Sequence, residues 1–337
     1  MKHLFLLICV LSLLVSCNST PKKTVQETAM QPVSLILDTD LGPDYDDVGA
    51  MAVMHALADS GYVDILATLS SNHDESVVPC IEVLNTYFNR PSIPVGAPKS
   101  EGGVTMTSGH KIKWTEALPD KYPHKTKKTS DAPDAVQVYR KVLSAQPDKS
   151  VVICTIGFFT NLKALLHSEG DEYSPLSGKE LVAKKVKQVV AMAGFFPKGR
   201  EFNVFCDTPA SKTVAEQWPT EIVFSGFEIG NVVLTGKKLV ASDITDSPVK
   251  DAYALCFAEG DPDGRMSWDL TAVWVAIKGY DPYYNVERGI FKVIDEEGTN
   301  TWIPDENGKD LRLIEKMPAG QMAALLENYM MHQPGSK

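Results

Sequence analysis

The sequence predicts an α/β fold: an open, mostly parallel sheet with helices on both faces and a late β-hairpin. Short apolar runs alternate along the chain with stretches of helical pattern, and polar residues directly follow several of these runs. Beyond a polar N-terminal region roughly 300 residues remain, which is within the range of one α/β domain. Such alternation is typical of a parallel sheet that helices cover on both sides.

The expected elements can be placed in chain order. Val33–Leu37 is short and aliphatic, which predicts a buried strand, and the apolar residues after Asp47 predict a helix packed on the sheet. Further strands are expected at 63–69, 93–96, 151–156, 186–192 and 221–224, and further helices at 75–88, 134–145, 160–167, 207–218, 268–278 and 318–330. Residues 289–294 and those near 301–303 predict the hairpin. Residues 97–129 are loop-rich and predict an active-site lid.

The N-terminus is typical of an export signal. Lys2 and His3 precede an apolar run over residues 4–14 that is too short to span a membrane. Leu14-Val15-Ser16-Cys17 resembles a bacterial lipobox, which implies cleavage before Cys17 and lipid attachment to its sulfur; the alternative is an ordinary secretory signal with an incidental cysteine. Residues 18–32 are polar and predict a flexible tether, followed by a single domain over 33–334. We therefore expect an exported protein, held at the bacterial cell envelope (periplasm or outer membrane) by its lipid alone.

Charge and cysteine content narrow the possible partners. The formal net charge of -10 argues against nucleic acid as a partner, because a phosphate backbone favours a basic face. Four cysteines beyond Cys17 (Cys80, Cys154, Cys206 and Cys256) lack metal-ligand spacing. We expect buried thiols, with a disulfide as the open alternative.

Five carboxylates lie within ten residues, from Asp38 to Asp47, directly after the first predicted strand. They are Asp38, Asp40, Asp44, Asp46 and Asp47. In open α/β sheets this edge is where ligands bind. So many anions repel one another unless a hard cation neutralises them, and Ca²⁺ or Mg²⁺ is the natural candidate. One or two of the acids could instead serve as turn or helix-cap residues.

Polar residues also follow later strands, which predicts one site assembled along a single rim. Asn72 follows the second strand, Thr160 follows the strand ending at Ile156, and Asp269 begins a helix beside Trp268. If residues 201–203 are extended, Glu201 and Asn203 point to one side and Phe202 points inward. Each could alone be a turn, cap or core residue.

With these residues the chain resembles the nucleoside hydrolases, calcium-dependent N-ribohydrolases that release ribose and base from nucleosides. The family pattern is Asp-x-Asp-Pro-Gly-x-Asp-Asp; here Asp38-Thr39-Asp40-Leu41-Gly42 precedes Asp46-Asp47, with two added residues and Leu41 in place of Pro. The resemblance runs from Leu35 to the C-terminal helix and implies the family's Rossmann-like core. Relatives are often dimers or tetramers, so a homo-oligomer is possible.

The resemblance implies a role for each matching residue. Calcium ligands would be Asp40, Asp47, Asp269 and the backbone carbonyl of Thr160, while Asp38 would brace the site from behind. Asp46, with Asp44 as the alternative, and Asn72 would hold ribose hydroxyls, and Glu201 and Asn203 would bind the 5′ and 3′ oxygens. A further family Asn is missing from the short loop 195–200, so altered recognition of the 5′-hydroxyl is expected.

The chemistry accounts for these residue types. Cleaving an N-glycosidic bond builds positive charge on the ribose, which nearby carboxylates stabilise. Asp40, beside a water that the metal activates, is the expected general base. Trp268 stands where many relatives place a His acid; in the purine-preferring branch a Trp there stacks on the base. Trp114 is a candidate second stacking face, and His73 and His110 are weaker candidates for a direct acid.

Three alternatives stay open at this point. Asp38-Thr39-Asp40 could be the nucleophile motif of a haloacid-dehalogenase-like phosphatase, although the later polar residues then have no role. A non-catalytic, lipid-anchored riboside receptor could keep the calcium site without turnover; a base such as Asp40 beside a water argues against it. The chemistry could also act on another N-riboside, such as a nicotinamide riboside.

Overall fold

The structure, a computed structural model, describes residues 31–99 and 102–335. The expected signal peptide, Cys17 and all but the last two residues of the tether lie outside these ranges. From Pro32 onward the chain forms one compact unit. In the part of the chain that is described, no helix is long and apolar enough to cross a membrane.

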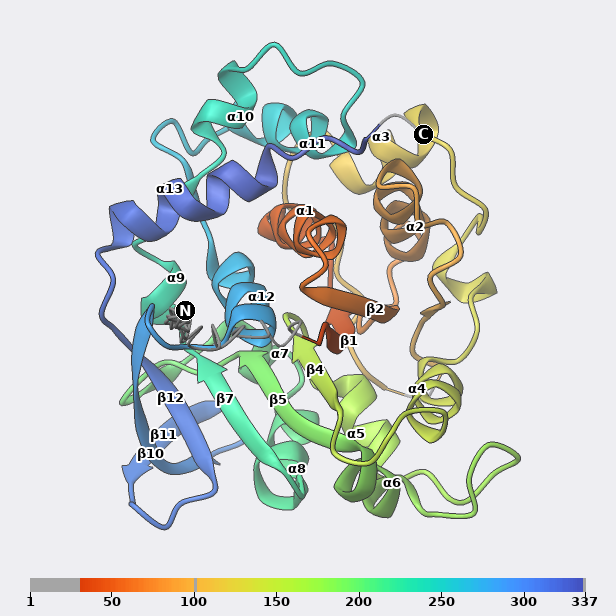
Figure 1. Cartoon of the computed structure of the whole chain (residues 1–337), viewed down its shortest axis with the longest axis vertical. Coiled ribbons are helices and arrows are strands. Elements are labelled where there is room, and N and C mark those ends of the chain that lie inside the picture. The colour runs from red at the N-terminus through yellow and green to blue at the C-terminus, as the bar shows by residue number, and fades with distance from the viewer. Residues whose placement is uncertain (1–30, 100–101, 336–337) are drawn as a thin grey trace, which may run out of the picture. The chain divides into compact units, whose positions relative to one another are not determined.

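The expected α/β fold is confirmed, with ten strands in the main sheet of the described chain (Figure 1). The strand order is β3-β2-β1-β4-β5-β7-β12-β10-β11-β6. The parallel strands are β1 (Val33–Thr39), β2 (Val63–Ser70), β3 (Val95–Gly96), β4 (Val151–Thr155), β5 (Val186–Met192) and β7 (Glu221–Ser225). The chain runs outward from β1 to β3, then returns to β4 on the other side. The topological switch point, where open α/β sheets bind ligands, therefore lies between β1 and β4.

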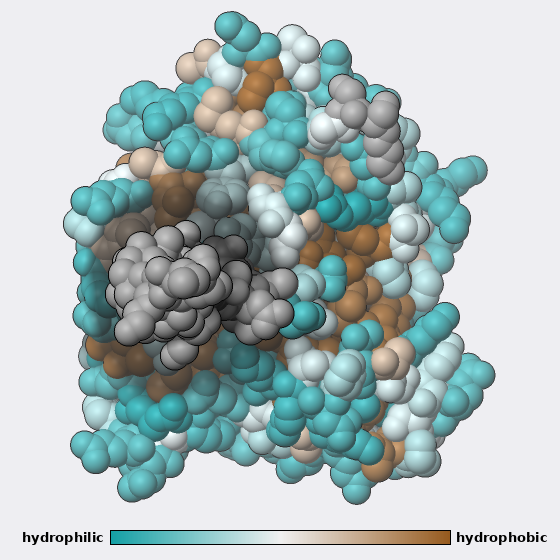
Figure 2. Space-filling model, viewed as in Figure 1, coloured by the Kyte–Doolittle hydropathy of each residue, from teal (hydrophilic) through white to brown (hydrophobic). Residues whose placement is uncertain are grey.

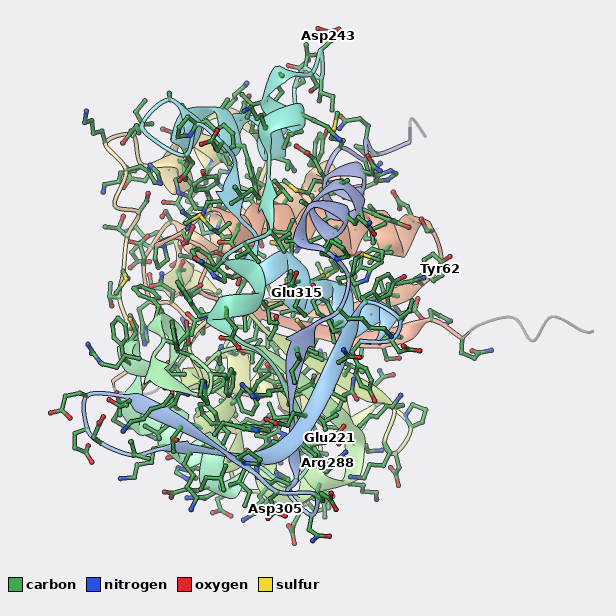
Figure 3. The ribbon with its side chains drawn as sticks, turned by 90° about the vertical axis from the view of Figure 1, so that its left-hand side faces the viewer. Tyr62, Glu221, Asp243, Arg288, Asp305 and Glu315 are labelled. Carbon is green, nitrogen blue, oxygen red and sulfur yellow. The ribbon has the colours of Figure 1, made fainter. Side chains whose placement is uncertain are left out.

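The predicted hairpin is part of a larger antiparallel extension. β10 (Tyr284–Val293) pairs with both β11 (Thr299–Pro304) and β12 (Asp310–Glu315), and β6 (Lys198–Arg200) adds to β11. β12 in turn runs parallel to β7. Arg288 of β10 reaches Glu221 of β7 with 2.9 Å between Nη2 and Oε2, which ties the extension to the parallel strands (Figure 3).

Helices cover both faces, and successive residues of the central strands alternate between two hydrophobic cores. Leu35 and Leu37 belong to one core, while Ile36 between them belongs to the other. The first core is covered by α1 (Asp46–Asp59), α2 (Val77–Tyr87), α3 (Trp114–Lys121), α9 (Phe227–Gly230), α10 (Lys237–Ala241), α11 (Pro248–Phe257), α12 (Trp268–Lys278) and α13 (Ala319–Met330). The second is covered by α4 (Ala135–Ser144), α5 (Thr160–Leu166), α6 (Gly178–Lys185), α7 (Phe202–Cys206) and α8 (Thr208–Gln217). In Figure 2 hydrophilic residues dominate the periphery, and hydrophobic residues gather near β1 and β2.

The segment expected to be a lid is more ordered than predicted. It contains α3 and a 3₁₀ turn over Thr129–Asp131, and isolated bridges pair Val104 with Asn72 and Ala97 with Asp134. Its backbone is thus held at Asn72, just past the end of β2, and at Asp134, just before α4. The four cysteines form no disulfide. Three of them are buried thiols, as expected, and Cys206 is half-buried.

His55 of α1 makes the stability of the fold depend on pH. Its side chain is fully buried, lies 3.0 Å from Asn85 Oδ1 and stacks on Phe88, and burial lowers its pKa to about 3. The unfolded chain binds this proton near pH 6.5, so the free energy of unfolding should fall as pH drops from about 6.5 toward 3. In His55→Gln this fall should be smaller, as measured by urea unfolding at several pH values. The control His167→Gln, at an exposed residue, should keep the wild-type slope; equal slopes in all three proteins would contradict the assignment.

Candidate active site

The acidic loop that follows β1 brings its carboxylates to the switch point. Asp40 lies directly past β1, and Asp46 and Asp47 form the first turn of α1; all three are buried. Thr39 Oγ1 and the Leu41 amide, at 3.2 Å, both donate to Asp47 Oδ1. Asp47 Oδ2 is buried without any hydrogen-bond partner among the described residues. An orphaned buried carboxylate oxygen is costly, which indicates that something else binds it.

Three carboxylates converge on one point. Asp46, Asp47 and Asp269 each offer an oxygen, and these oxygens lie within 4.8 Å of one another. Asp269 lies in the first turn of α12, and its backbone amide donates to Asp46 Oδ2 at 3.0 Å, which holds Asp269 next to Asp46. An all-oxygen donor set with an unsatisfied buried atom fits a hard divalent cation.

Burial and mutual repulsion raise the pKa values of the whole cluster. Burial is the largest cause for each member, followed for Asp40 and Asp269 by neighbouring carboxylates. The pKa of Asp46 is also raised well above its usual value, and that of Asp47 is raised to about 7. A bound cation would remove this penalty by supplying the missing positive charge.

Asp44, unlike the three clustered acids, has a basic partner. It pairs with Arg265, whose guanidinium lies 4.9 Å from the centre of the Tyr45 ring and 5.2 Å from that of Trp268. Of the two candidates left open by the sequence, the structure therefore places Asp46 in the carboxylate cluster and Asp44 at its edge. Arg265 was missed because it precedes the site residues on the two-residue strand β9 (Arg265–Met266).

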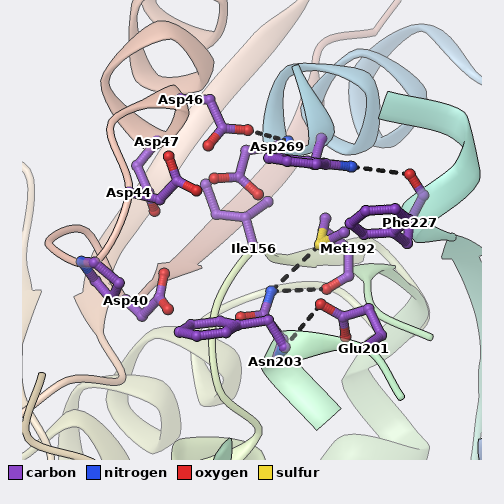
Figure 4. A pocket seen from close by; sticks show the side chains of 13 residues that line it. Asp40, Asp44, Asp46, Asp47, Ile156, Met192, Glu201, Asn203, Phe227 and Asp269 are labelled. Carbon is purple, nitrogen blue, oxygen red and sulfur yellow. Dashed lines mark hydrogen bonds between the residues drawn. The ribbon is translucent and has the colours of Figure 1, made fainter. Parts of the chain in front are cut away.

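A cavity of about 290 Å³ connects these acids to the other predicted residues (Figure 4). It is lined by Asp40, Pro43, Asp44, Asp46, Asp47, Ile156, Met192, Glu201, Phe202, Asn203, Phe227, Trp268 and Asp269. Asp46, Asp47 and Asp269 lie on one side, and Glu201 and Asn203 on the opposite side. None of the lining residues is basic.

Glu201 and Asn203 begin α7, so the segment is not extended as expected. Glu201 caps the helix, with Oε1 accepting from the Asn203 amide at 2.9 Å and Oε2 accepting from the Gly194 and Val204 amides at 3.1 Å. Burial raises the pKa of Glu201 to about 7. Because the helix turns here, Phe202 points outward into the cavity with 38% exposure instead of inward.

Trp268 presents a ring face and not a proton donor. Its indole N–H donates to the Phe227 carbonyl at 2.8 Å, and the two ring centres lie 5.3 Å apart. Gly230 packs so tightly on the Trp268 backbone and ring that a Cβ would be 2.7 Å from Cδ1. The ring is therefore fixed in orientation at the edge of the cavity.

Asp38 and Asn72 lie behind the cavity. Asp38 accepts from the Tyr139 hydroxyl at 2.8 Å and from Asn161 at 3.2 Å, in keeping with a bracing position. Asn72 Nδ2 donates to the Asp40 carbonyl at 2.9 Å and to the Met106 carbonyl at 2.7 Å, and its Oδ1 accepts two backbone amides. The side-chain amide of Asn72 thus holds the two loops together and does not line the cavity, and its role in binding ribose stays a prediction.

Two further predicted site residues, Thr160 and Trp114, do not line this cavity. Thr160 donates to Asp207 Oδ2 at 2.6 Å and lines a different cavity, whereas Ile156 of the same connection lines this one. Trp114 is fully buried in the first core and does not line the cavity, because a large indole at the start of α3 gains more by packing there.

Gly157 allows the β4 connection to approach Asp40. A Cβ at this residue would lie 2.6 Å from Ser71 Oγ and still closer to the Asp40 amide. The sequence signal was available, since a glycine directly follows the strand that ends at the switch point.

The sequence model of the inosine-uridine preferring nucleoside hydrolases matches residues 35–314. The chain belongs to this family. As a nucleoside hydrolase it is an enzyme that acts on N-glycosyl bonds. The match covers the carboxylate cluster, the cavity and most of the sheet extension. No relative was found among the curated proteins.

Solved nucleoside hydrolases share the fold. An inosine-uridine preferring nucleoside hydrolase from Bacillus anthracis is 15% identical with a TM-score of 0.66, covering 89% of this chain and 99% of its own. A purine-preferring ribonucleoside hydrolase from Gardnerella vaginalis is 16% identical with a TM-score of 0.66, covering 88% and 96%. A plant nucleoside hydrolase is 20% identical with a TM-score of 0.65, covering 89% and 99%.

Adding one methyl group at Gly157 should damage the site. Because the neighbouring backbone of Asp40 cannot move freely, Gly157→Ala should lower the free energy of unfolding by about 2 kcal/mol and displace Asp40. Chemical denaturation and riboside hydrolysis measure the two effects. Gly109→Ala is the matched control, since a Cβ there meets nothing within 4 Å, and it should change neither. A fully active and stable Gly157→Ala protein would mean that the close approach is unimportant.

Proposed function

We propose that the protein hydrolyses purine ribonucleosides to ribose and free base with the help of a bound Ca²⁺. The observation that supports this most directly is the buried cluster of Asp46, Asp47 and Asp269, which opens with Asp40 into a cavity beside Trp268. Oxygen donors alone favour a hard cation, and when bound it would hold the sugar hydroxyls and polarise the attacking water.

The residues of the cavity have different roles in the hydrolysis. The C1′–N bond breaks while the oxygen of water bonds to C1′, and Asp40 accepts a proton from that water. The carboxylates stabilise the positive charge that develops on the ribose. We assign the backbone carbonyl ligand to Ile156, which lines this cavity, and not to Thr160, which lines a different one. Asn203 Nδ2 donates to the Met192 carbonyl at 3.1 Å, which orients its amide oxygen as an acceptor.

The leaving base would stack on an aromatic surface formed by Trp268 and Phe227. Trp268 can stack on a purine, which has a larger face than a pyrimidine, and Phe227 continues this surface. Since the indole N–H is bound to Phe227, the proton that the departing base takes up comes from solvent. This supports purine over pyrimidine ribosides as substrates.

The activity is tested by release of base and ribose from a panel of nucleosides. Inosine, adenosine or guanosine should be cleaved with added calcium, and chelator should abolish cleavage. Asp40→Asn should lower kcat by about 100-fold or more, because it removes the general base. Asp263→Asn, whose side chain is 87% exposed and outside the cavity, should behave as the wild type.

Calorimetry separates the enzyme from a receptor. Calcium should bind the wild-type protein and fail to bind Asp269→Asn. Binding of calcium and ribose without turnover of any riboside would reject the hydrolase and favour the receptor.

We further propose that the protein is exported and anchored to the cell envelope through lipid on Cys17. The apolar run over residues 4–14 and the lipobox-like Leu14-Val15-Ser16-Cys17 support this. In a bacterial host, radiolabelled palmitate should enter the protein and the membrane fraction should contain it. Cys17→Ala should lose the label, whereas Cys206→Ala should retain it. A wild-type protein without label would show that the segment is an ordinary signal.

A further inference from the structure

The stereochemistry of a riboside determines where its 5′ group must lie in this cavity. In a β-ribonucleoside the base and the 5′ carbon share one face of the sugar ring, and the 2′- and 3′-hydroxyls occupy the other. If the proposed function holds, the hydroxyls face Asp46, Asp47 and Asp269. The base and the 5′ group then both project away from this cluster.

The side of the cavity away from the cluster is largely apolar. Met192 and Phe227 lie there next to Glu201 and Asn203 (Figure 4). The Phe227 amide donates to the Gly194 carbonyl at 2.8 Å, while the Gly194 amide donates to Glu201, so one glycine holds Phe227 beside Glu201. A 5′ group beside a base stacked on Trp268 therefore meets the side chains of Met192 and Phe227.

The polar groups at this end are mostly engaged by the protein itself. Glu201 accepts three backbone amides, and the Asn203 amide nitrogen donates to Met192. The connection from Phe195 to Arg200 contributes no side chain to the cavity lining. The amide oxygen of Asn203 is an acceptor, and no side-chain donor of the cavity is left free to bind the oxygen of a 5′-hydroxyl, so burying one here gains little.

A rigid second layer supports the apolar side. Phe195 stacks on Phe227, with ring centres 5.4 Å apart and planes inclined by 23°. Fully buried Asn300 binds the Phe195 backbone at both ends, accepting from its amide and donating to its carbonyl at 2.9 Å. Phe195 is thus held as a fixed aromatic surface although it is 37% exposed.

We propose that the site prefers ribosides whose 5′ carbon carries an apolar group, namely 5′-deoxy and 5′-alkylthio ribosides, over those with a free 5′-hydroxyl. The end beside Met192 and Phe227 is the subsite for this group. Ribosides with a 5′-phosphate are rejected, because no basic side chain lines the cavity and the Glu201 carboxyl group borders this end.

The test compares kcat/KM for adenosine, 5′-deoxyadenosine, 5′-methylthioadenosine and adenosine 5′-monophosphate in calcium. The methylthio compound should exceed adenosine by about 10-fold, as one extra apolar group in such a pocket allows, and the deoxy compound should at least equal adenosine. A site built to bind the hydroxyl would instead reject the deoxy compound by about 10⁴-fold. Both analogues falling below adenosine would overturn the proposal while leaving the hydrolase intact.

Variants locate the subsite. Phe227→Gln adds an amide beside Glu201 and should bring the ratio of methylthio to hydroxyl substrate to one or below. Phe195→Ser removes the ring that supports Phe227 without changing a cavity residue, and it should also reduce the ratio. This variant replaces Phe227→Gln in the test if Phe227→Gln does not fold. Ile314→Ser, at a residue that is 38% exposed on β12 and outside the cavity, is the matched control and should keep the wild-type ratio. An unchanged ratio in folded Phe227→Gln or Phe195→Ser contradicts the proposal.

Failure of the proposed function gives a different result. If no riboside is cleaved, calorimetric Kd values for adenosine and 5′-methylthioadenosine decide the question. Tighter binding of the methylthio compound supports the apolar subsite even without catalysis, and weaker binding rejects it.

Discussion

Mutual repulsion among buried carboxylates is the constraint on which the rest of this structure depends. The acids from Asp38 to Asp47 differ in the partners that the protein gives them. Asp38 receives donors from Tyr139 and Asn161, and Asp44 is paired with Arg265. Asp46 and Asp47, with Asp269, remain without a basic partner and meet at one point. Pairing the outer acids within the protein confines the unbalanced charge to a volume that one divalent cation can neutralise.

The sheet topology explains why these groups meet at all. Asp40 leaves β1 and Ile156 leaves β4, the two strands on either side of the switch point, and α12 brings Asp269 from more than 200 residues further along the chain. Gly157 lets the two strand connections touch, and Asn72 ties the acidic loop to the Met106 loop through backbone atoms. The polar residues behind the cavity thus fix the backbone of the acidic loop.

The sequence predicted the acids better than their surroundings, for physical reasons. Clustered carboxylates after a strand are hard to bury, so Asp40, Asp46 and Asp47 signal a site by themselves, and the family resemblance located Asp269 and Glu201. Met192 and Phe227 carried no such signal, because apolar residues at strand and helix ends are expected in the core. Trp114 and Thr160 do not line the cavity, because the indole of Trp114 packs in the core and the hydroxyl of Thr160 donates to Asp207.

Trp268 connects the chemistry to the choice of substrate. With its N–H bound to the Phe227 carbonyl, its contribution is a ring face whose orientation Gly230 and Phe227 fix. The same Phe227 also borders the space beside Glu201, so the surface that receives the base continues into the surface that receives the 5′ group. Because both substituents leave the sugar on one face, a single aromatic surface governs both recognitions. A change at Phe227 should therefore alter preference at the base and at the 5′ carbon together, whereas a change at Phe195 should act mainly at the 5′ carbon.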